Sequence, residues 1–355
     1  MKIWKIAKIY LKVFKVYMYI KVNGGKGMLI LSKEDIRKVF SMKDAVDSVK
    51  QAFSIYSEGK SVVPLRVNID VAKCGGQSLF MPGYVPDLDS VGIKIVSVFP
   101  KNVEKGIPSV PAQMILLDGT TGEVCCIMDG TYLTQLRTGA ASGAATDVLA
   151  SPDAKVAAIF GAGGQAMCQL EALLAVRKLE LVKVFALGDE AKKFVEAAKI
   201  QLKEYGVEII AAESAEEALK DADIITAVTT SKKPVFPGNL VKKGAHVNGV
   251  GSYTREMQEL DEYIVTKADK VFVDSKDAVI AEAGDFIQPM EKGLIDNSRI
   301  DGELGEVILG KLKGRESNSE ITLFKTVGIA IQDVVTASRI YKKALEKGIG
   351  RVVEI

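Results

Sequence analysis

The chain has 355 residues, of which 48% are hydrophobic and 26% are charged, and its formal net charge is +2. This composition is typical of a globular protein large enough for two domains, and it excludes the strong basic excess of a nucleic-acid-binding protein. The four cysteines form no CxxC motif and there is one histidine, so we expect neither a metal site nor a disulfide framework. A reducing, cytoplasmic environment is the default expectation.

Residues 1–27 differ from the rest of the chain, because lysines alternate with apolar residues and no acidic residue occurs. The lysines interrupt every apolar run far below the ~20 residues that a membrane span needs, so we expect no span. Two interpretations of this atypical basic extension stay open. It is a basic helix at a membrane surface, or translation begins at Met28.

From Met28 onward the pattern is typical of a folded domain. Ser32 and Asp35 predict a helix start, and residues 42–56 are typical of an amphipathic helix. A helix rich in small residues is expected over residues 131–150. Between these helices, short apolar or alternating segments predict the strands of an antiparallel or mixed sheet, at residues 67–71, 77–81, 91–99, 112–117 and 123–128.

A glycine-rich loop in the middle of the chain joins an apolar strand to a helix. Residues 156–160 are apolar, and a G-x-G-x-x-A motif follows directly at residues 161–166. In this context the glycines let backbone N–H groups approach a pyrophosphate at the N-terminus of the helix. The loop residues are therefore predicted to bind a dinucleotide: Gly161, Gly163, Gly164, Gln165 and Ala166.

Strands and helices alternate beyond this loop, which predicts a doubly wound parallel sheet. A helix is expected over residues 192–202, and Ser214 with Glu217 predicts a capping box. Thr229 follows the fourth strand, at the edge of the sheet where ligands bind. A late helix, residues 328–347, can return to the first domain. The expected strands are residues 182–187, 207–210, 224–228, 245–250 and 270–273, the last of which completes the sheet.

Two single residues invite a chemical role. Lys94 interrupts the otherwise apolar strand 91–98, and a lysine is costly to bury there unless it meets an anion. The alternative is a lysine on an edge strand that faces water. His246 is the only histidine, and its place at the start of a strand favours a packed structural residue over a catalytic one.

Five segments in this order resemble the ornithine cyclodeaminase/mu-crystallin family, over about residues 28–350. They are MPGYVPDLDSVGIKIV (81–96), YLTQLRTGAASGAAT (132–146), the GAGGQA loop, GAHVNGVGSYTREMQEL (244–260) and GRESNSEITLFKTVGIAIQD (314–333). The resemblance implies an α/β protein in which a Rossmann domain, residues 146–329, is inserted in a mixed α/β dimerisation domain made of residues 28–145 and 330–355. It also implies a homodimer joined through the dimerisation domain.

The resemblance implies roles for three cationic residues. Arg66 matches the arginine that binds the substrate carboxylate, and Arg137 matches one that contacts the cofactor and the carboxylate region. A planar guanidinium binds a carboxylate or phosphate with two hydrogen bonds, which lysine does not. Lys94 matches the family's lysine beside the reacting nitrogen, where it can bind the carboxylate and pass a proton.

The resemblance also implies the rest of the ligand-binding residues. Ser109 matches a hydroxyl that contacts the cofactor, and Val327 matches a residue that lines the substrate. The remaining cofactor residues that it implies are Val250, Gly251, Ser252 and Thr326.

This chain departs from the family pattern at two places. Ala186 stands where the acidic residue that selects NAD usually lies, so the choice between NAD and NADP stays open. Tyr253 and Met257 replace an aspartate and a lysine that cyclodeaminases of the family carry. Because tyrosine, with an ordinary pKa of ~10, is a poor base at neutral pH, this departure favours simple hydride transfer over cyclodeamination.

These features predict an NAD(P)H-dependent reductase of a cyclic 2-imino acid, of the pyrroline- or piperideine-2-carboxylate type. Arg66, Lys94 and Arg137 would hold the carboxylate, and Lys94 would protonate the nitrogen. Ornithine cyclodeamination, which gives L-proline and ammonia, and an alanine-type NAD(P)-dependent dehydrogenase are the alternatives within the family. A different class is a crystallin-like protein that binds NAD(P)H or another ligand without turnover.

Overall fold

The computed structural model describes residues 27–354, so the prediction for the basic extension falls on residues 1–26, which lie outside the described residues. The described chain divides into two compact units. Residues 27–137 and 329–354 form the first unit, and residues 138–328 form the second unit. Helix α4 (Gly130–Leu149) contains the first boundary and matches the helix expected over residues 131–150.

The first unit is built on a seven-stranded mixed sheet with the order β15-β1-β6-β5-β4-β3-β2. Only the pair β1 and β6 is parallel, and the other neighbours are antiparallel. The strands are β1 (Gly27–Leu31), β2 (Val67–Val71), β3 (Gly76–Val85), β4 (Ser90–Val98), β5 (Ala112–Asp118), β6 (Val124–Asp129) and β15 (Arg351–Glu354). Short 3₁₀ helices occupy Ala72–Cys74, Pro86–Leu88 and Pro100–Lys105.

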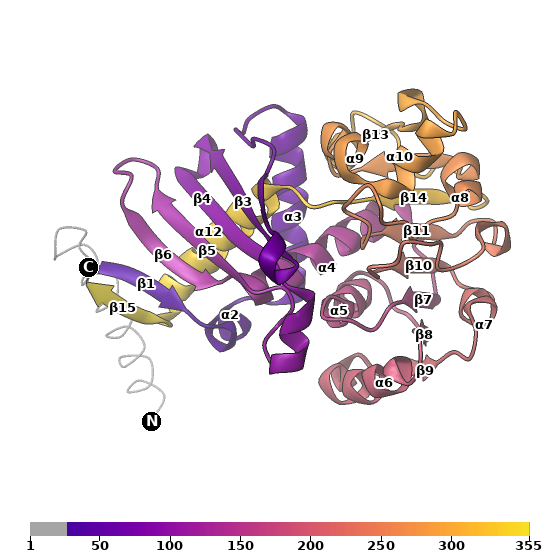
Figure 1. Ribbon diagram of the computed structural model, residues 1–355, viewed down its shortest axis with the longest axis horizontal. Helices are drawn as coiled ribbons and strands as arrows, with labels where there is room; N and C mark the ends of the chain where they lie inside the picture. The colour runs from indigo at the N-terminus through magenta and orange to yellow at the C-terminus, as the bar shows by residue number, and fades with distance from the viewer. Residues whose placement is uncertain (1–26, 355) are drawn as a thin grey trace. The chain divides into compact units, whose positions relative to one another are not determined.

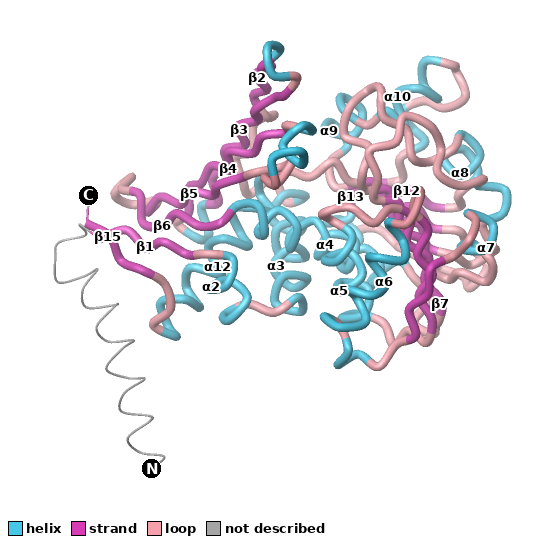
Figure 2. The backbone as a smooth tube through the Cα atoms, turned by 60° about the horizontal axis from the view of Figure 1, so that its bottom comes forward, coloured by secondary structure: helices cyan, strands magenta, loops and turns pink. Residues whose placement is uncertain are grey.

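Three helices, α2 (Lys33–Val39), α3 (Met42–Ser57) and α12 (Ala330–Lys347), cover one face of this sheet, as Figure 2 shows. The late helix α12 packs against α3 and against β3, β4 and β5. Gly83 of β3 permits close approach, because a Cβ atom there would lie 3.2 Å from Val334 of α12. The predicted capping box of Ser32 and Asp35 is confirmed at the start of α2. The first unit therefore joins the two ends of the described chain in one core.

The second unit is a parallel eight-stranded sheet with the order β13-β12-β14-β11-β10-β7-β8-β9, which confirms the predicted Rossmann-type fold. The strand order reverses between β7 and β10, and this is where such sheets bind their ligands. The strands are β7 (Val156–Phe160), β8 (Leu181–Phe185), β9 (Glu208–Ala211), β10 (Ile224–Ala227), β11 (His246–Gly249), β12 (Lys270–Val273), β13 (Gly302–Glu303) and β14 (Thr322–Lys325).

Helices cover both faces of this sheet, with α5 and α6 on one side and α7 on the other (Figure 1). The hydrophobic core joins Ile159 of β7 and Val184 of β8 to Leu170 and Leu173 of α5. The helices are α5 (Ala166–Val176), α6 (Glu190–Gln201), α7 (Ala215–Leu219), α8 (Glu262–Lys267), α9 (Lys276–Glu282), α10 (Gly284–Glu291) and α11 (Leu304–Ile308). Short 3₁₀ helices occupy Lys203–Tyr205, Gly238–Leu240 and Asn297–Arg299.

Two predictions for this unit are wrong. The sheet is not completed by residues 270–273, because β14 inserts between β11 and β12 and β13 pairs with the outer side of β12. The two-residue strand β13 is too short to show a periodic pattern, and nothing in the local sequence specifies that β14 pairs between β11 and β12. The capping box at Ser214 is only half formed: Ser214 accepts from the N–H of Glu217, but the Glu217 carboxylate accepts from the N–H of Glu213.

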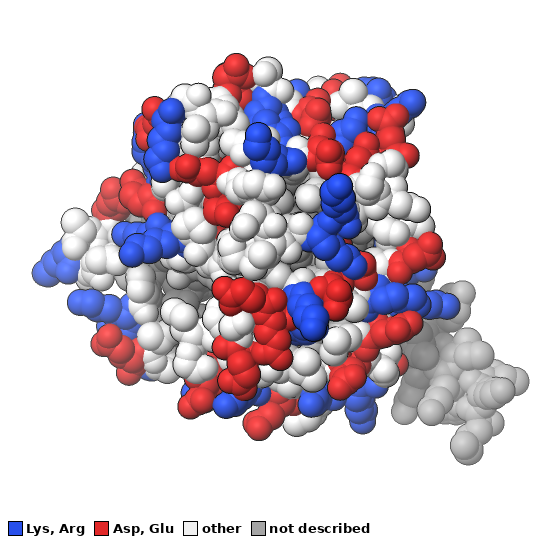
Figure 3. All heavy atoms as spheres, turned by 90° about the vertical axis from the view of Figure 1, so that its right-hand side faces the viewer, with Lys and Arg blue, Asp and Glu red and all other residues white. Residues whose placement is uncertain are grey.

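The distribution of charge on the surface and the length and polarity of the helices bear on function. On the face shown in Figure 3, basic and acidic side chains are interspersed, so that face carries no extended basic patch. Among the described residues, every helix is too short or too polar to cross a bilayer.

Candidate active site

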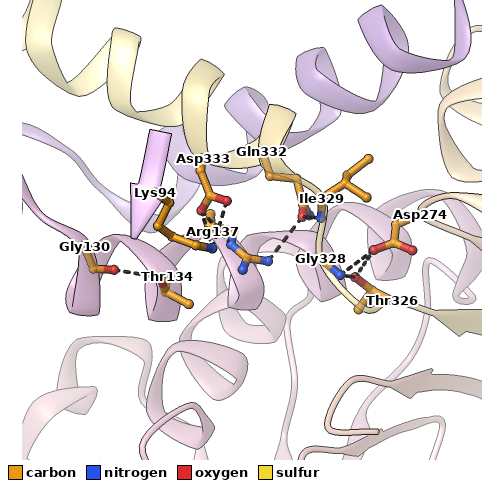
Figure 4. A network of polar contacts seen from close by, with 10 residues as sticks. All are labelled: Lys94, Gly130, Thr134, Arg137, Asp274, Thr326, Gly328, Ile329, Gln332 and Asp333. Atoms are coloured by element: carbon orange, nitrogen blue, oxygen red, sulfur yellow. Dashed lines mark hydrogen bonds and ion pairs between the residues drawn. The ribbon is translucent and has the colours of Figure 1, made fainter. Parts of the chain in front are cut away.

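A buried ion pair lies at the centre of the first unit. Lys94 belongs to β4, between β3 and β5, and its side chain points to Asp333 in the first turns of α12 (Figure 4). Its Nζ lies 3.0 Å from Oδ1 and 2.8 Å from Oδ2 of Asp333, and both residues are fully buried. The lysine therefore meets an anion inside the protein and does not face water from an edge strand.

Arg137 joins the same cluster from α4. Its Nε donates to Oδ1 of Asp333 at 3.0 Å, and its Nη1 donates to Oε1 of Gln332 at 3.2 Å. The same Gln332 oxygen accepts the N–H of Ile329 at 3.0 Å. With Lys94 protonated, the cluster holds two positive charges and one negative charge. Because buried charge is costly unless it is balanced, this arrangement favours the binding of one further anion, such as a carboxylate.

The surroundings of Lys94 tune its proton affinity. Burial and the neighbouring Arg137 charge lower the pKa of Lys94 to about 7, against the opposing effect of Asp333. The charge of Arg66 acts in the same direction as that of Arg137. An ammonium group with a pKa near neutrality can hold a proton and also release it, which is the property of a general acid.

Two other predicted residues of the first unit lie in loops. Arg66 is half-buried directly before β2, and its positive charge contributes to lowering the pKa of Lys94. Ser109 is half-buried before β5, where its carbonyl oxygen accepts the N–H of Phe99 at 2.8 Å. Its side chain takes no part in the hydrogen bonds that the described residues make around Lys94 and Asp333.

The glycine loop of the second unit has room for a ligand next to its backbone. Gly163 and Gly164 are exposed, and a Cβ atom on Gly163 would meet nothing within 4 Å. Gly161 differs, because its φ is +109° and a Cβ atom would lie 2.7 Å from the carbonyl oxygen of Val228. The Gln165 side-chain oxygen is buried without a hydrogen-bond partner among the described residues. An open backbone loop before α5 fits a dinucleotide pyrophosphate.

Two buried acids organise the carboxyl ends of the neighbouring strands. After β14, Oδ2 of Asp274 accepts from the hydroxyl of Thr326 at 2.6 Å and from the N–H of Gly328 at 2.7 Å (Figure 4). The same oxygen accepts the N–H of Val327 at 3.0 Å. After β10 and β11, the carboxylate of Glu259 accepts backbone N–H groups. Burial raises the pKa of Asp274, and it raises the pKa of Glu259 to about 7. Hydrogen bonds to these two carboxylates thus hold the backbone of the segments after β14, β10 and β11 in place.

Four cofactor residues were predicted near Glu259. The Glu259 carboxylate accepts the N–H groups of three of them, Thr229, Gly251 and Ser252. The N–H of the fourth, Val250, donates to the carbonyl oxygen of Ala227.

Sequence reasoning did not single out Asp333, Gln332, Asp274 or Glu259. A signal was present for Asp333, which lies among apolar residues in A-I-Q-D-V-V, and for Asp274, which directly follows the apolar strand β12. An acid in such a setting is buried and needs partners. The partners themselves come from distant parts of the chain, so the pattern does not identify them.

Three further positions bear on the open questions. Ala186 directly follows β8 and is followed by the exposed Leu187, so the structure offers no acid at the usual NAD-selecting position. Tyr253 is half-buried in the loop after β11. His246 is fully buried, its Nδ1 and Nε2 lie 2.9 Å from the Thr322 hydroxyl and 3.1 Å from the Asn248 side-chain oxygen, and burial lowers its pKa to about 3. It is a neutral residue of the core.

A Rossmann-type unit with an open glycine loop is typical of dinucleotide-binding proteins, and the buried lysine–aspartate–arginine cluster has a charge that would suit an organic anion. A sequence model of the ornithine cyclodeaminase/mu-crystallin family matches residues 27–348, so the chain belongs to this family, as its motifs predicted.

Relatives of this chain include named reductases and a dehydrogenase. It is 38% identical to a Delta(1)-pyrroline-2-carboxylate reductase of Bacillus cereus over 327 residues, covering 92% of this chain and 100% of the relative. The structure of Thermococcus litoralis Delta(1)-pyrroline-2-carboxylate reductase in complex with NADH and L-proline is similar, with a TM-score of 0.87, 46% identity and coverage of 91% and 99%. An archaeal alanine dehydrogenase dimer with bound NAD follows, with a TM-score of 0.84, 35% identity and coverage of 93% and 99%.

Proposed function

We propose that this protein reduces a cyclic 2-imino acid, with Delta(1)-pyrroline-2-carboxylate as the preferred substrate and L-proline as the product. The observation that carries this proposal is the buried cluster of Lys94, Arg137 and Asp333, whose excess positive charge suits a single carboxylate. The similarity to reductases of this substrate, one of them in complex with NADH and L-proline, supports it.

The chain's own residues would bind the substrate and supply a proton. Arg66, Arg137 and Lys94 would hold the carboxylate through charge-assisted hydrogen bonds, and Val327 would line the substrate. When bound, NAD(P)H supplies the hydride that reduces the imine carbon. The Nζ of Lys94 would give its proton to the imine nitrogen, so that the C=N bond becomes a C–N bond bearing one new hydrogen at each end. Asp333 would keep the Lys94 side chain in place.

The residues proposed to hold the cofactor form two groups. The loop between β7 and α5 would bind the pyrophosphate through backbone N–H groups. The second group would bind the nicotinamide half and its surroundings. The loop group is Gly161, Gly163, Gly164, Gln165 and Ala166, and the second group is Ser109, Arg137, Thr229, Val250, Gly251, Ser252 and Thr326. Because Ala186 offers no acid to the ribose, use of both NADH and NADPH is proposed.

A homodimer in the reducing cytoplasm is the proposed native form. The edge strand β2 exposes the apolar side chains of Val67 (56%) and Ile69 (52%), and Leu65 before it is 62% exposed. An apolar edge strand is a surface that proteins usually cover. The molar mass in solution tests this: a dimer is expected for the wild type, and a shift toward monomer for Val67→Lys combined with Ile69→Lys.

A substrate panel tests the reaction. Rates with NADH and NADPH are measured for pyrroline-2-carboxylate, piperideine-2-carboxylate, and pyruvate with ammonia, and L-ornithine is supplied with catalytic NAD. The fastest turnover is expected with pyrroline-2-carboxylate. Faster turnover of pyruvate and ammonia would favour the alanine-type dehydrogenase, and proline formation from L-ornithine would favour the cyclodeaminase, against the Tyr253 argument. Cofactor binding without turnover of any compound would favour the crystallin-like carrier.

A further inference from the structure

A single buried carboxylate joins the ends of two neighbouring strands in the second unit. Glu259 is fully buried, and its Oε1 accepts the N–H of Thr229. Its Oε2 accepts the N–H of Gly251 at 2.5 Å and that of Ser252 at 3.0 Å. Thr229 follows β10, whereas Gly251 and Ser252 follow β11, and these strands are parallel neighbours. One side chain therefore fixes both connections at the carboxyl edge of the sheet.

The two connections touch each other at Gly251. A Cβ atom on Gly251 would lie 1.9 Å from the carbonyl oxygen of Thr229, and 2.7 Å from Oε1 of Glu259. Such distances leave no room for any side chain at this position. The close approach brings the three N–H groups within reach of one carboxylate, and the carboxylate in turn keeps the connections together.

Glu259 is itself held by a second buried acid and a buried lysine. Oδ1 of Asp285 accepts the N–H groups of Glu259 at 2.7 Å and Leu260 at 3.0 Å. Oδ2 of Asp285 accepts from Nζ of Lys325 at 2.7 Å, and neither side chain is exposed. Because Lys325 ends β14, which pairs with β11, the series Lys325–Asp285–Glu259 ties the carboxyl ends of three adjacent strands.

The carboxyl edge formed by β10, β11 and β14 lies on one side of the glycine loop. The loop follows β7, which pairs with β10, and the chain order reverses there. A dinucleotide whose pyrophosphate lies at the loop crosses this reversal, so one half extends over the ends of β10, β11 and β14. Since Glu259 occupies the N–H groups of Thr229, Gly251 and Ser252, these segments keep mainly carbonyl and hydroxyl oxygens for a ligand. Such acceptors suit the carboxamide NH₂ and the ribose hydroxyls of nicotinamide riboside.

We propose that Glu259 is a positioning residue for the nicotinamide half of the cofactor. It sets the conformation of the connections after β10 and β11 without contacting the reacting atoms. This inference rests on the proposed use of NAD(P)H. It predicts that loss of the carboxylate weakens binding of the nicotinamide half and spares the half that binds on the other side of the loop.

The experiment compares the affinities of NADH and ADP-ribose, which lacks the nicotinamide. Glu259→Gln replaces one acceptor oxygen by a donor and cannot accept all three N–H groups. Removal of buried hydrogen bonds to a charged group is expected to weaken NADH at least about tenfold. The affinity for ADP-ribose is expected to stay within about threefold, since a change below ~0.7 kcal/mol reflects only slight loosening of the loop.

The matched control is a carboxylate with the same kind of bonds at the opposite edge of the sheet. Oδ2 of Asp223 accepts the N–H groups of Lys155 at 2.7 Å and Val156 at 2.9 Å, where β7 begins. Asp223→Asn should leave the ratio of the two affinities unchanged, even if it lowers the melting temperature. Equal weakening of both ligands by Glu259→Gln, or no weakening, would overturn the proposal.

If Glu259→Gln does not fold, Glu259→Asp replaces it, because aspartate keeps the charge and shortens the side chain. The ratio of the dissociation constants of NADH and ADP-ribose again tests the proposal, and a smaller rise in the NADH dissociation constant is expected. A wild-type protein that binds NADH and reduces no imino acid would contradict the proposed function and leave this ratio test intact. A wild-type protein in which NADH and ADP-ribose bind equally well would overturn the positioning role.

Discussion

At the scale of single residues, the chemistry depends on how Lys94 is surrounded. Its ammonium group contacts both carboxylate oxygens of Asp333, and Arg137 contacts one of them. Asp333 therefore shares its negative charge between two cations. In the proposed mechanism, a substrate carboxylate would add the negative charge that the cluster lacks, and the same charge would stabilise the protonated form of Lys94. Substrate binding and proton supply would then be linked through this one cluster.

Lys94→Ala is expected to lower kcat by about 10²- to 10⁴-fold, the usual contribution of a positioned proton donor. The variant should bind NADH within a few-fold of the wild type, because Lys94 is assigned to the substrate and not to the pyrophosphate. Steady-state rates and fluorescence titration with NADH measure the two quantities. Near-normal turnover would remove Lys94 from the mechanism.

The pH dependence tests the role of Asp333. Since the pKa of Lys94 is about 7, kcat/KM should fall as the pH rises above neutrality and Lys94 loses its proton. Asp333→Asn removes the negative charge that raises this pKa, while the positive charges of Arg137 and Arg66 remain. The falling limb should therefore move to lower pH. Both proteins are measured with the same substrate, so the substrate's own ionisation cancels, and an unchanged limb would contradict the assignment.

At the scale of elements, two of the three glycines of the loop, Gly161 and Gly163, have different roles. Gly163→Val should leave the melting temperature nearly unchanged, because open space surrounds its Cβ position, and should abolish NADH binding by filling the space of the pyrophosphate. Gly161→Ala should instead destabilise the fold by about 1–3 kcal/mol, because of its positive φ and its contact with Val228. Thermal unfolding and NADH titration of both variants distinguish the two. Intact NADH binding by Gly163→Val would show that the loop does not hold the pyrophosphate.

The elements also show what local sequence encodes. The strand–loop–helix at residues 156–176 was predictable because its signals are contiguous: an apolar run, three glycines and a helical period. Lys94 was predictable as a special residue because a charge interrupts an apolar strand. Its partner Asp333 lies 239 residues away, and nothing local specifies that pairing. For the same reason the sequence did not point to Glu259, whose bonded N–H groups lie up to 30 residues away. It did not point to the short strand β14 either.

At the scale of the whole molecule, the two units divide the proposed work. In this proposal the first unit presents the buried cluster of Lys94, Arg137 and Asp333, and the second unit presents the glycine loop and the strand ends that Asp274 and Glu259 hold. Because the proposed reaction needs the imino-acid substrate and NAD(P)H together, neither unit alone is expected to be active. Membership of the family predicts the reaction class, while the choice among imino and amino acids depends on a few side chains such as Tyr253.

The most direct test of the central claim follows the hydride itself. NADH deuterated at the transferred position is mixed with the wild-type protein and pyrroline-2-carboxylate, and the product is analysed by mass spectrometry. Proline with one deuterium at its α-carbon is expected, in an amount equal to the NADH consumed, and Lys94→Ala should give only a trace. No deuterated proline from this mixture, together with proline and ammonia from L-ornithine and catalytic NAD, would contradict the account.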